Sequence, residues 1–209
     1  MERRFYSRAL AAALLAVAGC FNEPEPAYKS VTEGQRVYLK EKGYKSFAEV
    51  PQEALKLGEK IDYLNLDRNA LTNVDGVAAL TGLKWLRLNG NALKALPDLK
   101  GLVNLRRIYL RDNRFATVPE ALKELPNLTD IDLSGNPIRE VPEWLARKEG
   151  LENLSFTGTQ ITKLPEDLSA WKSLKSLQLG DLRLSAEEMK RIRAAFEPGE
   201  RPLGTAVVF

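Results

Sequence analysis

The chain has 209 residues, of which 44% are hydrophobic and 28% are charged, and its formal net charge at pH 7 is +3. This is an ordinary composition for one soluble domain or a short repeat array, and it predicts neither disorder nor a protein with many membrane spans. The sequence has no histidine and a single cysteine, Cys20. These counts exclude an intrachain disulfide, a Ser-His-Asp or Cys-His catalytic machinery, and a zinc site built from His and Cys.

The amino terminus has the pattern of a secretory signal. Residues 1–8 are short and positive, and residues 9–18 form an unbroken apolar run. That run is shorter than the roughly 20 residues that a spanning helix needs, so residues 1–19 are predicted to be a signal peptide. Without residues 1–19 the formal net charge falls to +1. No basic excess then remains to indicate a nucleic-acid partner.

The end of the apolar run carries a more specific motif. Val17-Ala18-Gly19-Cys20 resembles the lipobox of bacterial lipoproteins. The resemblance implies cleavage before Cys20, acyl chains such as palmitate on that residue, and a lipid anchor in the cell envelope after secretion across the inner membrane. Phe21, in place of an Asp at that position, favours the outer membrane by the same resemblance. Residues 20–30 are expected to be the lipidated cysteine and a short tether; the alternative is an ordinary signal peptide with a chance cysteine.

A repeat governs the middle of the chain. Its first copy, from Ile61, places Leu64, Leu66, Asn69 and Leu71 at fixed intervals. Copies of this pattern begin at six positions, spaced by 22 residues twice and then by 23 residues three times: Ile61, Leu83, Leu105, Leu128, Leu151 and Leu174. Apolar residues alternate with polar ones inside each copy, which predicts a short strand. Such strands would stack in parallel and join their leucines into one core.

This pattern resembles the leucine-rich-repeat family, L-x-x-L-x-L-x-x-N-x-L, over residues 61–184. The resemblance implies an α/β solenoid, a right-handed horseshoe segment with a parallel concave sheet, about six repeats and a cap at each end. It also implies that the repeated asparagines cap backbone groups between coils, in a ladder of Asn69, Asn91, Asn113 and Asn136. Thr159 would fill the next rung only in part, and Leu182 not at all, so the ladder is expected to fade.

The predicted caps flank this array. Residues 31–60 are expected to be an N-terminal cap and partial repeat, with a helix around 31–42 and a segment 47–51 that echoes 115–119. Residues 185–209 are expected to be a C-terminal cap of helix and strand. There Ser185 and Glu188 have the spacing of a capping box, and residues 205–209 are predicted to close the sheet.

The back half of each coil varies more than the strand half. Prolines at 119, 142 and 165 are suited to the first turn of short helices, and the first two copies, one residue shorter, are expected to use tighter turns. Trp144 and Trp171 recur in this part of successive coils. We expect them to pack in or beside the core, because large aromatic side chains bury much surface; a second binding face is the alternative.

The outward strand positions form columns across the predicted sheet, and in this family they line the usual binding surface. The first three repeats bring aromatic and basic residues together there, and the later ones contribute acidic and small residues. The candidate ligand-binding residues are Tyr63, Trp85, Arg87, Arg107, Tyr109, Arg111, Asp130 and Asp132. Exposed Trp, Tyr and Arg often carry binding energy, which favours the aromatic-basic half.

Blander interpretations of these columns stay open. Arg107 lies one strand from Asp130, and an Arg can stack on Trp85, so the patch could satisfy itself without a ligand. Asp130 and Asp132 point the same way, but a solvated charge pair is a better interpretation than calcium or acid-base chemistry.

The functional expectation is a binding module, not an enzyme, that holds a protein or peptide on its concave face. No catalytic residue, cofactor or metal ligand is expected. A glycan or cell-wall ligand bound by stacking on Trp85 and Tyr109 is the alternative, together with a structural or adhesion role in the envelope. Beyond the partner, the lipid on Cys20 is expected to engage a membrane.

Overall fold

The computed structural model describes residues 35–196 and 206–209, which lie in one compact unit of the chain, Val31–Phe209. The predicted signal peptide, Cys20 and the tether at 20–30 lie outside the described residues, and these assignments stay predictions.

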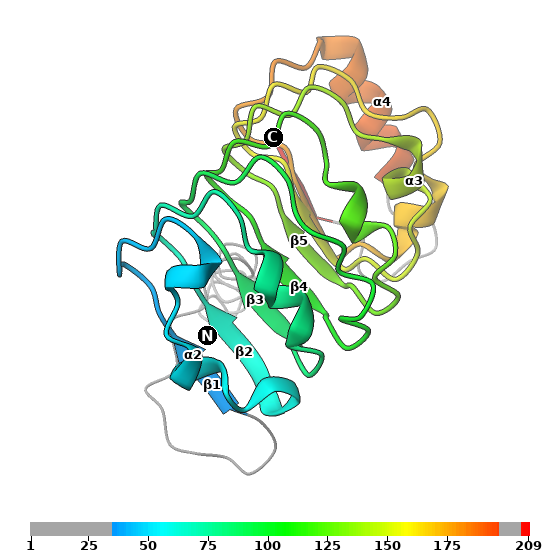
Figure 1. The fold of residues 1–209 in the computed structure, drawn as a ribbon. Helices are drawn as coiled ribbons and strands as arrows, with labels where there is room; N and C mark the ends of the chain where they lie inside the picture. Colours follow the sequence, from blue (N-terminus) through cyan, green and yellow to red (C-terminus); the bar gives the residue numbers. More distant parts are fainter. Residues whose placement is uncertain (1–34, 197–205) are drawn as a thin grey trace, which may run out of the picture. The chain divides into compact units, whose positions relative to one another are not determined.

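One parallel sheet organises this unit (Figure 1). Its strands succeed one another in chain order, and each pairs in parallel with the next: β1 (Gln35–Tyr38), β2 (Ile61–Asn65), β3 (Trp85–Arg87), β4 (Arg107–Tyr109), β5 (Asp130–Asp132), β6 (Asn153–Ser155), β7 (Ser176–Gln178) and β8 (Ala206–Val208). The predicted α/β solenoid with a parallel sheet is thus confirmed, and so is the predicted closing strand near the carboxyl terminus.

The core follows from the repeat. The central residue of each short strand points inward, and the register aligns Leu64, Leu86 and Ile108 side by side, followed by the equivalent residues of β5, β6 and β7. All of these side chains are fully buried. A three-residue strand cannot bury its apolar side alone, so the stacking of coils is what makes the core.

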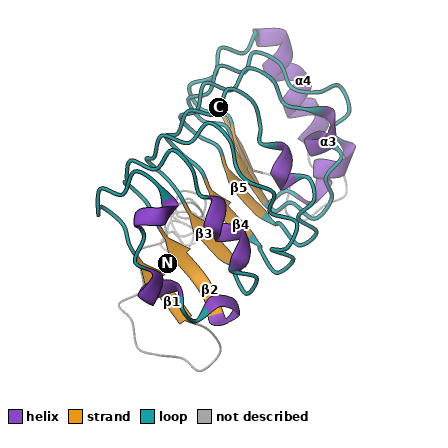
Figure 2. Cartoon of the chain, viewed as in Figure 1, coloured by secondary structure: helices purple, strands orange, loops and turns teal. Residues whose placement is uncertain are grey.

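Short helices and turns form the side of each coil away from the strands (Figure 2). They are η1 (Phe47–Glu49), α2 (Gln52–Leu55), η2 (Gly58–Lys60), η3 (Asp75–Ala79), η4 (Glu120–Leu122), α3 (Glu143–Ala146), η5 (Ser169–Ser173) and α4 (Ala186–Phe196), where η marks a 3-10 helix. Pro119 and Pro142 lie directly before η4 and α3, close to the predicted helix starts. Pro165 has no helix directly after it. No helix among the described residues is both long and apolar enough to cross a membrane.

The predicted helix around 31–42 is wrong for its described part. Residues Gln35–Tyr38 form strand β1, which pairs in parallel with β2. Val37 and Leu39 have the same spacing as Leu64 and Leu66, and both pack against the core. The free edge of β2 offers backbone partners to an extended segment, and this tertiary pairing outweighs local helical propensity.

The asparagine ladder is present as predicted. Asn113 Nδ2 donates to the carbonyl oxygens of Leu88 and Leu110, both at 2.9 Å, and its Oδ1 accepts from the amide of Leu93 at 3.1 Å. Asn91 and Asn136 make equivalent bonds to their own coil and to the preceding one. The ladder then stops, because Thr159 Oγ1 is buried with no hydrogen-bond partner.

The carboxyl-terminal helix α4 is fixed to the last coils by a buried carboxylate. The Glu188 amide donates to Ser185 Oγ at 3.1 Å, which is one half of the predicted capping box. The Glu188 side chain does not complete the box. Its Oε1 accepts from the Leu164 amide at 2.8 Å and from Arg191 Nη2 at 2.7 Å, while Arg191 Nη2 also donates to the Leu164 carbonyl oxygen at 3.0 Å. This latch joins α4 to a coil about 24 residues earlier in the chain.

The two tryptophans of the back side pack as expected. Trp171 is fully buried and donates through Nε1 to the Leu145 carbonyl oxygen at 2.8 Å. Trp144 is partly buried against the core and donates to Glu120 Oε1 at 2.7 Å. Both therefore join successive coils.

Candidate binding face of the sheet

Two columns of side chains cross the side of the sheet opposite the leucine core, here called the sheet face. The register of β1 to β7 gives the first column as Arg36, Tyr63, Trp85, Arg107, Asp130, Asn153 and Ser176, and the second as Tyr38, Asn65, Arg87, Tyr109, Asp132, Ser155 and Gln178. Seven of the eight candidate residues named from the sequence lie in these two columns, and the exception is Arg111. Arg36 and Tyr38 were not predicted to lie in these columns, because their segment was expected to form a helix.

The first column begins with an aromatic-arginine stack of four residues, Arg36, Tyr63, Trp85 and Arg107. The rings of Tyr63 and Trp85 lie edge to face, with centroids 5.8 Å apart. The Arg107 guanidinium lies 4.4 Å from the Trp85 ring centroid. The Arg36 guanidinium lies 5.7 Å from the Tyr63 centroid and 5.9 Å from that of Trp85. The structure therefore brings together the aromatic and basic side chains that the sequence singled out, and adds Arg36.

Arg87 makes the equivalent arrangement in the second column. Its guanidinium lies 5.3 Å from the Tyr109 ring centroid, and its Nη2 lies 2.7 Å from Asp67 Oδ2. Burial opposes the charge on Arg87, but the facing Asp67 carboxylate outweighs it, and the pKa of the guanidinium is raised. Arg87 is thus held as a permanent cation between an aromatic ring and an acid.

Several predicted site residues are more enclosed than expected. Tyr63 is 4% exposed and Tyr109 is 3% exposed, so these two present little area to a partner. Asp130 and Asp132 are each 2% exposed, and the expected solvated charge pair is wrong. Arg111, by contrast, is exposed and pairs at 3.2 Å with the adjacent Asp112. Neighbouring strands lie too close together for these side chains to stand apart in water.

The two buried carboxylates have different surroundings. Asp130 Oδ1 accepts from Asn153 Nδ2 at 2.7 Å, and its Oδ2 lies 3.7 Å from Arg107 Nε. Asp132 Oδ1 accepts from the hydroxyl and amide of Ser134, at 2.6 and 3.0 Å. Burial raises the pKa of Asp132 despite those two bonds. Within the described ranges, no cluster of three or more His, Cys, Asp or Glu side chains that could hold a metal ion occurs.

Farther along the first column, two buried polar atoms are unsatisfied. Asn153 is 7% exposed and Ser176 is 2% exposed. In the part of the chain that the structure describes, neither Asn153 Oδ1 nor Ser176 Oγ has a hydrogen-bond partner. A buried polar atom without a partner costs about 1–3 kcal/mol, so it calls for an explanation.

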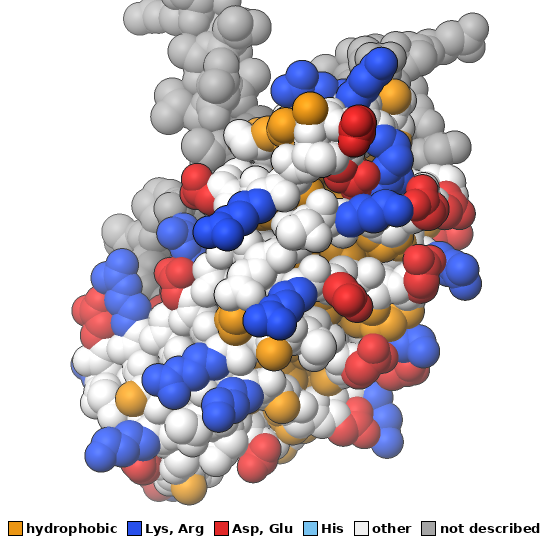
Figure 3. Space-filling view, turned by 90° about the horizontal axis from the view of Figure 1, so that it is seen from above, with side chains coloured by type: hydrophobic (Ala, Val, Ile, Leu, Met, Phe, Trp, Pro, Cys, Tyr) orange, Lys and Arg blue, Asp and Glu red, His pale blue; other side chains and the backbone are white. Residues whose placement is uncertain are grey.

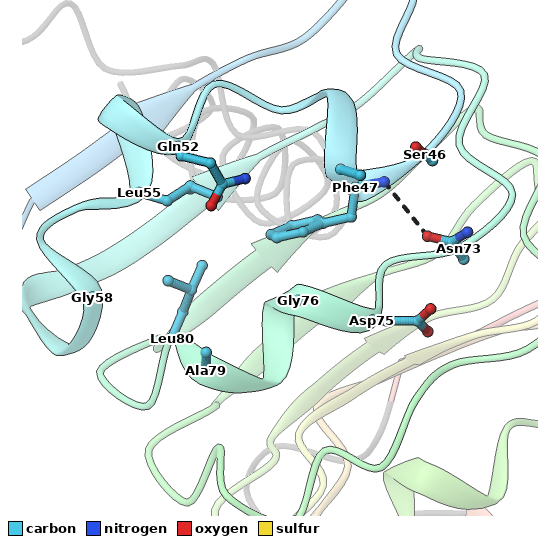
Figure 4. A pocket seen from close by; sticks show the side chains of 11 residues that line it. Ser46, Phe47, Gln52, Leu55, Gly58, Asn73, Asp75, Gly76, Ala79 and Leu80 are labelled. Carbon is cyan, nitrogen blue, oxygen red and sulfur yellow. Dashed lines mark hydrogen bonds between the residues drawn. The ribbon is translucent and has the colours of Figure 1, made fainter.

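A cavity of about 570 Å³ opens on the other side of the molecule, between the first coils (Figure 4). Phe47, Leu55 and Leu80 supply apolar lining, and the Phe47 amide donates to Asn73 Oδ1 at 3.5 Å. Gly76 lies against the Phe47 ring, where a Cβ would collide. The other polar side chains that line the cavity are those of Ser46, Gln52 and Asp75, and together they do not indicate one class of ligand.

Charge is mixed elsewhere on the surface. Figure 3 shows acidic and basic side chains interspersed over the face in view, without one dominant sign.

Comparison with known proteins agrees with this geometry. Residues 81–138 match the leucine-rich-repeat family model. The fold is a leucine-rich-repeat solenoid. A similar solved structure is a TDR receptor, at 22% identity and a TM-score of 0.55, covering 63% of this chain and 24% of the receptor chain. Another is a leucine-rich-repeat protein of Leptospira interrogans, at 22% identity and a TM-score of 0.40, covering 68% of this chain and 55% of that one.

These solved chains are longer than the segments they share with this solenoid: the match spans about half of one and a quarter of the other. Among curated proteins, none matches the sequence. The shared feature is the fold of the repeat scaffold.

Proposed function

We propose that this chain is a lipid-anchored envelope protein that holds a protein or peptide partner on the sheet face of its leucine-rich-repeat solenoid. Leucine-rich-repeat domains commonly mediate protein binding, and one structural neighbour is named a receptor. Fold alone does not identify a ligand, so the support for a protein partner comes from the side chains of the sheet face.

The observation that carries the proposal is the aromatic-arginine stack. Two guanidinium groups lie within 6 Å of the Trp85 ring centroid, at 4.4 and 5.9 Å. Arg87 is fixed in the neighbouring column by Asp67. Side chains fixed in this way lose little conformational entropy on binding, and Trp and Arg are the residue types most enriched among binding hot spots. The stack is therefore a preorganised anchor for a protein surface.

A bound glycan is the second candidate, and the same contacts argue against it. A sugar ring would stack on an open aromatic face, but the Arg107 guanidinium lies over the Trp85 ring, and Tyr109 is 3% exposed with Arg87 over its ring. Binding led by arginine also weakens as salt rises, whereas sugar stacking does not. A salt titration of any ligand found separates the two candidates.

Membrane attachment is the other half of the proposal. Its support is the lipobox-like Val17-Ala18-Gly19-Cys20 after a signal-like segment, and Phe21 favours the outer membrane. Several acyl chains on Cys20 would give stable anchoring, since a single chain holds only marginally. Metabolic labelling with a palmitate analogue tests this directly: the wild-type chain should be labelled, and Cys20→Ser should not.

The binding function is tested by crosslinking in intact bacterial cells that produce the full chain. The patch variant is Trp85→Ala with Arg107→Glu. The matched control is Trp144→Ala with Arg147→Glu, which changes the same residue types and the same charge on the back side, where Arg147 is exposed. All three chains are first shown to have similar melting temperatures. A milder patch variant, Trp85→Phe with Arg107→Gln, replaces the first if that one unfolds.

The expected result is a crosslinked protein that the wild type and the back-side control share and the patch variant loses. Identical crosslinking by all three chains, or none by any, would contradict the assignment of the sheet face as the binding surface. A sugar-rich ligand whose binding does not change with salt would instead support glycan binding, the second candidate function.

A further inference from the structure

We propose that the sheet face carries a second subsite over β6 and β7, which takes a Lys or Arg side chain of the bound peptide through Asn153 Oδ1 and Ser176 Oγ. This inference rests on the proposed peptide binding and adds the chemistry and orientation of the partner. It begins with the two buried oxygen atoms that have no hydrogen-bond partner within the described residues.

The orientation of Asn153 follows from its neighbour. Asp130, as a carboxylate, can only accept hydrogen bonds, so the amide group of Asn153 turns its Nδ2 toward Asp130 Oδ1 at 2.7 Å. Its Oδ1 is then left as an acceptor. Ser176 lies beside it on the next strand, in register with Asn153. The first column thus runs from a cation, Arg107, through an anion and an amide to an acceptor that lacks a donor.

Charge decides which donor fits. Over β1 to β4 the two columns hold three cations and no anion: Arg36, Arg87 and Arg107. Over β5 to β7 they hold two anions and no cation: Asp130 and Asp132. Asp132 forms no ion pair with any described residue. A donor that carries positive charge gains from both carboxylates, whereas a neutral hydroxyl gains only the hydrogen bond.

The strand spacing sets the partner's pattern. Neighbouring strands lie about 4.8 Å apart, so three steps from β3 to β6, or from β4 to β7, cover about 14 Å. An extended peptide that crosses the strands advances about 3.4 Å per residue. An acidic residue over Arg87 and Arg107 would therefore be followed by a Lys or Arg about four residues away, over Asn153 and Ser176.

The probe is a phage-displayed library of random twelve-residue peptides, selected on the full chain purified in detergent. The variants are Ser176→Ala, which removes one acceptor, and Ser176→Lys, which supplies a cation from the chain itself. Ser176→Ala should not lower stability, because the hydroxyl has no partner to lose. The back-side pair Trp144→Ala, Arg147→Glu is the control for selection on other surfaces.

Selected peptides should carry an acidic residue and a Lys or Arg about four residues apart. Replacing that base by norleucine should weaken binding to the wild type about tenfold, as expected for one charge-assisted hydrogen bond. The same replacement should matter less than about twofold for Ser176→Lys, whose own cation occupies the subsite.

Two failures are distinguishable. Peptides that depend on Trp85 and Arg107 but show no preference for a base, or lose equally in wild type and Ser176→Lys, would overturn the subsite and leave the proposed function standing. Peptides that bind the Trp85→Ala, Arg107→Glu variant as well as the wild type, or no selection above background, would overturn both.

Discussion

The coils from Ile61 to Asn136 and the coils after Asn136 share one frame but are joined by different bonds. In the first region each asparagine of the ladder holds backbone groups of two coils at once, as Asn113 does with Leu88, Leu93 and Leu110. In the second region the corresponding residue is Thr159 and then Leu182. There the Thr159 backbone amide donates to the Phe156 carbonyl oxygen at 3.0 Å, and the Thr159 hydroxyl makes no hydrogen bond to any described residue.

The second region compensates through its end. The latch between Glu188, Arg191 and Leu164 and the buried indole of Trp171 join coils from the back side instead of from the turn after the strand. Stacked coils therefore need side chains that bridge them, but the position of the bridge can move from the turn after the strand to the carboxyl-terminal cap. Stability in the second region thus depends on helix α4 remaining docked.

The largest expected effect is a loss of stability in the first region. Asn113→Leu leaves the Leu93 amide without a partner and removes one donor each from the Leu88 and Leu110 carbonyl oxygens. We expect a loss of about 2–3 kcal/mol in the free energy of unfolding, measured by urea denaturation of the full chain. Thr159→Val is the matched control at the equivalent rung. It removes a hydroxyl without a partner and should cost less than about 0.5 kcal/mol; equal losses for both variants would contradict the comparison.

The next largest effect is a loss of stability in the second region. Glu188→Gln weakens the bonds to Leu164 and Arg191, and a loss of about 1–2 kcal/mol is expected. The hydrogen bond from Arg191 holds the pKa of Glu188 below its ordinary value, so the stability that Glu188 contributes is fully present above that ordinary value and is lost as the pH falls through the lower folded pKa. The protection factor of the Leu164 amide, which is its hydrogen-exchange rate corrected for the intrinsic slowing of exchange in acid, should therefore fall in acid for the wild type.

The same acid-dependent exchange should be absent in Glu188→Gln, while Glu187→Gln, an exposed neighbour on the same helix, should behave as wild type. If Leu164 exchange follows global unfolding in every chain, the latch does not hold the second region separately.

Two glycines, one in each region, lie in the turn directly before the ladder position. Gly135 and Gly158 have φ of 66° and 68°, in the left-handed region, so each Gly→Ala change should cost about 1 kcal/mol. A Cβ at Gly135 also meets the Asp112 carboxylate, whereas one at Gly158 has no contact closer than 3.9 Å. Gly135→Ala should therefore lower the urea midpoint more than Gly158→Ala. The reverse order would show that the turn at Gly158 tolerates a Cβ less well than the turn at Gly135.

The smallest expected effect concerns strand β5, where the two regions meet. Burial raises the pKa of Asp132, so the folded state penalises its charge at neutral pH. Asp132→Asn keeps the bonds from Ser134 and should stabilise the fold by up to about 1 kcal/mol above the folded pKa, with the gain vanishing in acid as the wild-type carboxyl takes up its proton. Asp130→Asn should instead destabilise, because an amide nitrogen would replace the oxygen that accepts from Thr129 Oγ1 and faces Arg107, although Asn153 could still donate to the remaining oxygen.

The sequence was sufficient for the scaffold because the scaffold is periodic. A leucine at every second strand position and an asparagine three residues after Leu66 fix the inward face, the register and the ladder, and the structure confirms all three. Strand β1 was missed because Val37 and Leu39 are only one fragment of the motif. What makes that fragment a strand is the edge of β2, which no local pattern encodes.

The positions of the candidate site residues on the sheet could be predicted from the sequence, but their burial and hydrogen bonding could not. Register placed Trp85, Arg107 and Asp130 in one column, as the structure confirms. The enclosure of Tyr109 and the unsatisfied oxygen of Asn153 depend on the sizes and donor directions of side chains on adjacent strands. Those are properties of the assembled sheet, and a single repeat carries no information about them.

The ladder also bears on how such a protein changes over generations. Asn113 and Asn136 each bond only to their own coil and the preceding one, with the same atoms at nearly the same distances. A gene duplication that copied residues 114–136 would thus insert a coil that fits both neighbours and leaves the two caps untouched. The length of the sheet face and its binding chemistry can then evolve separately. The number of repeats sets how far the face extends, and point substitutions on the strands set which partner it binds.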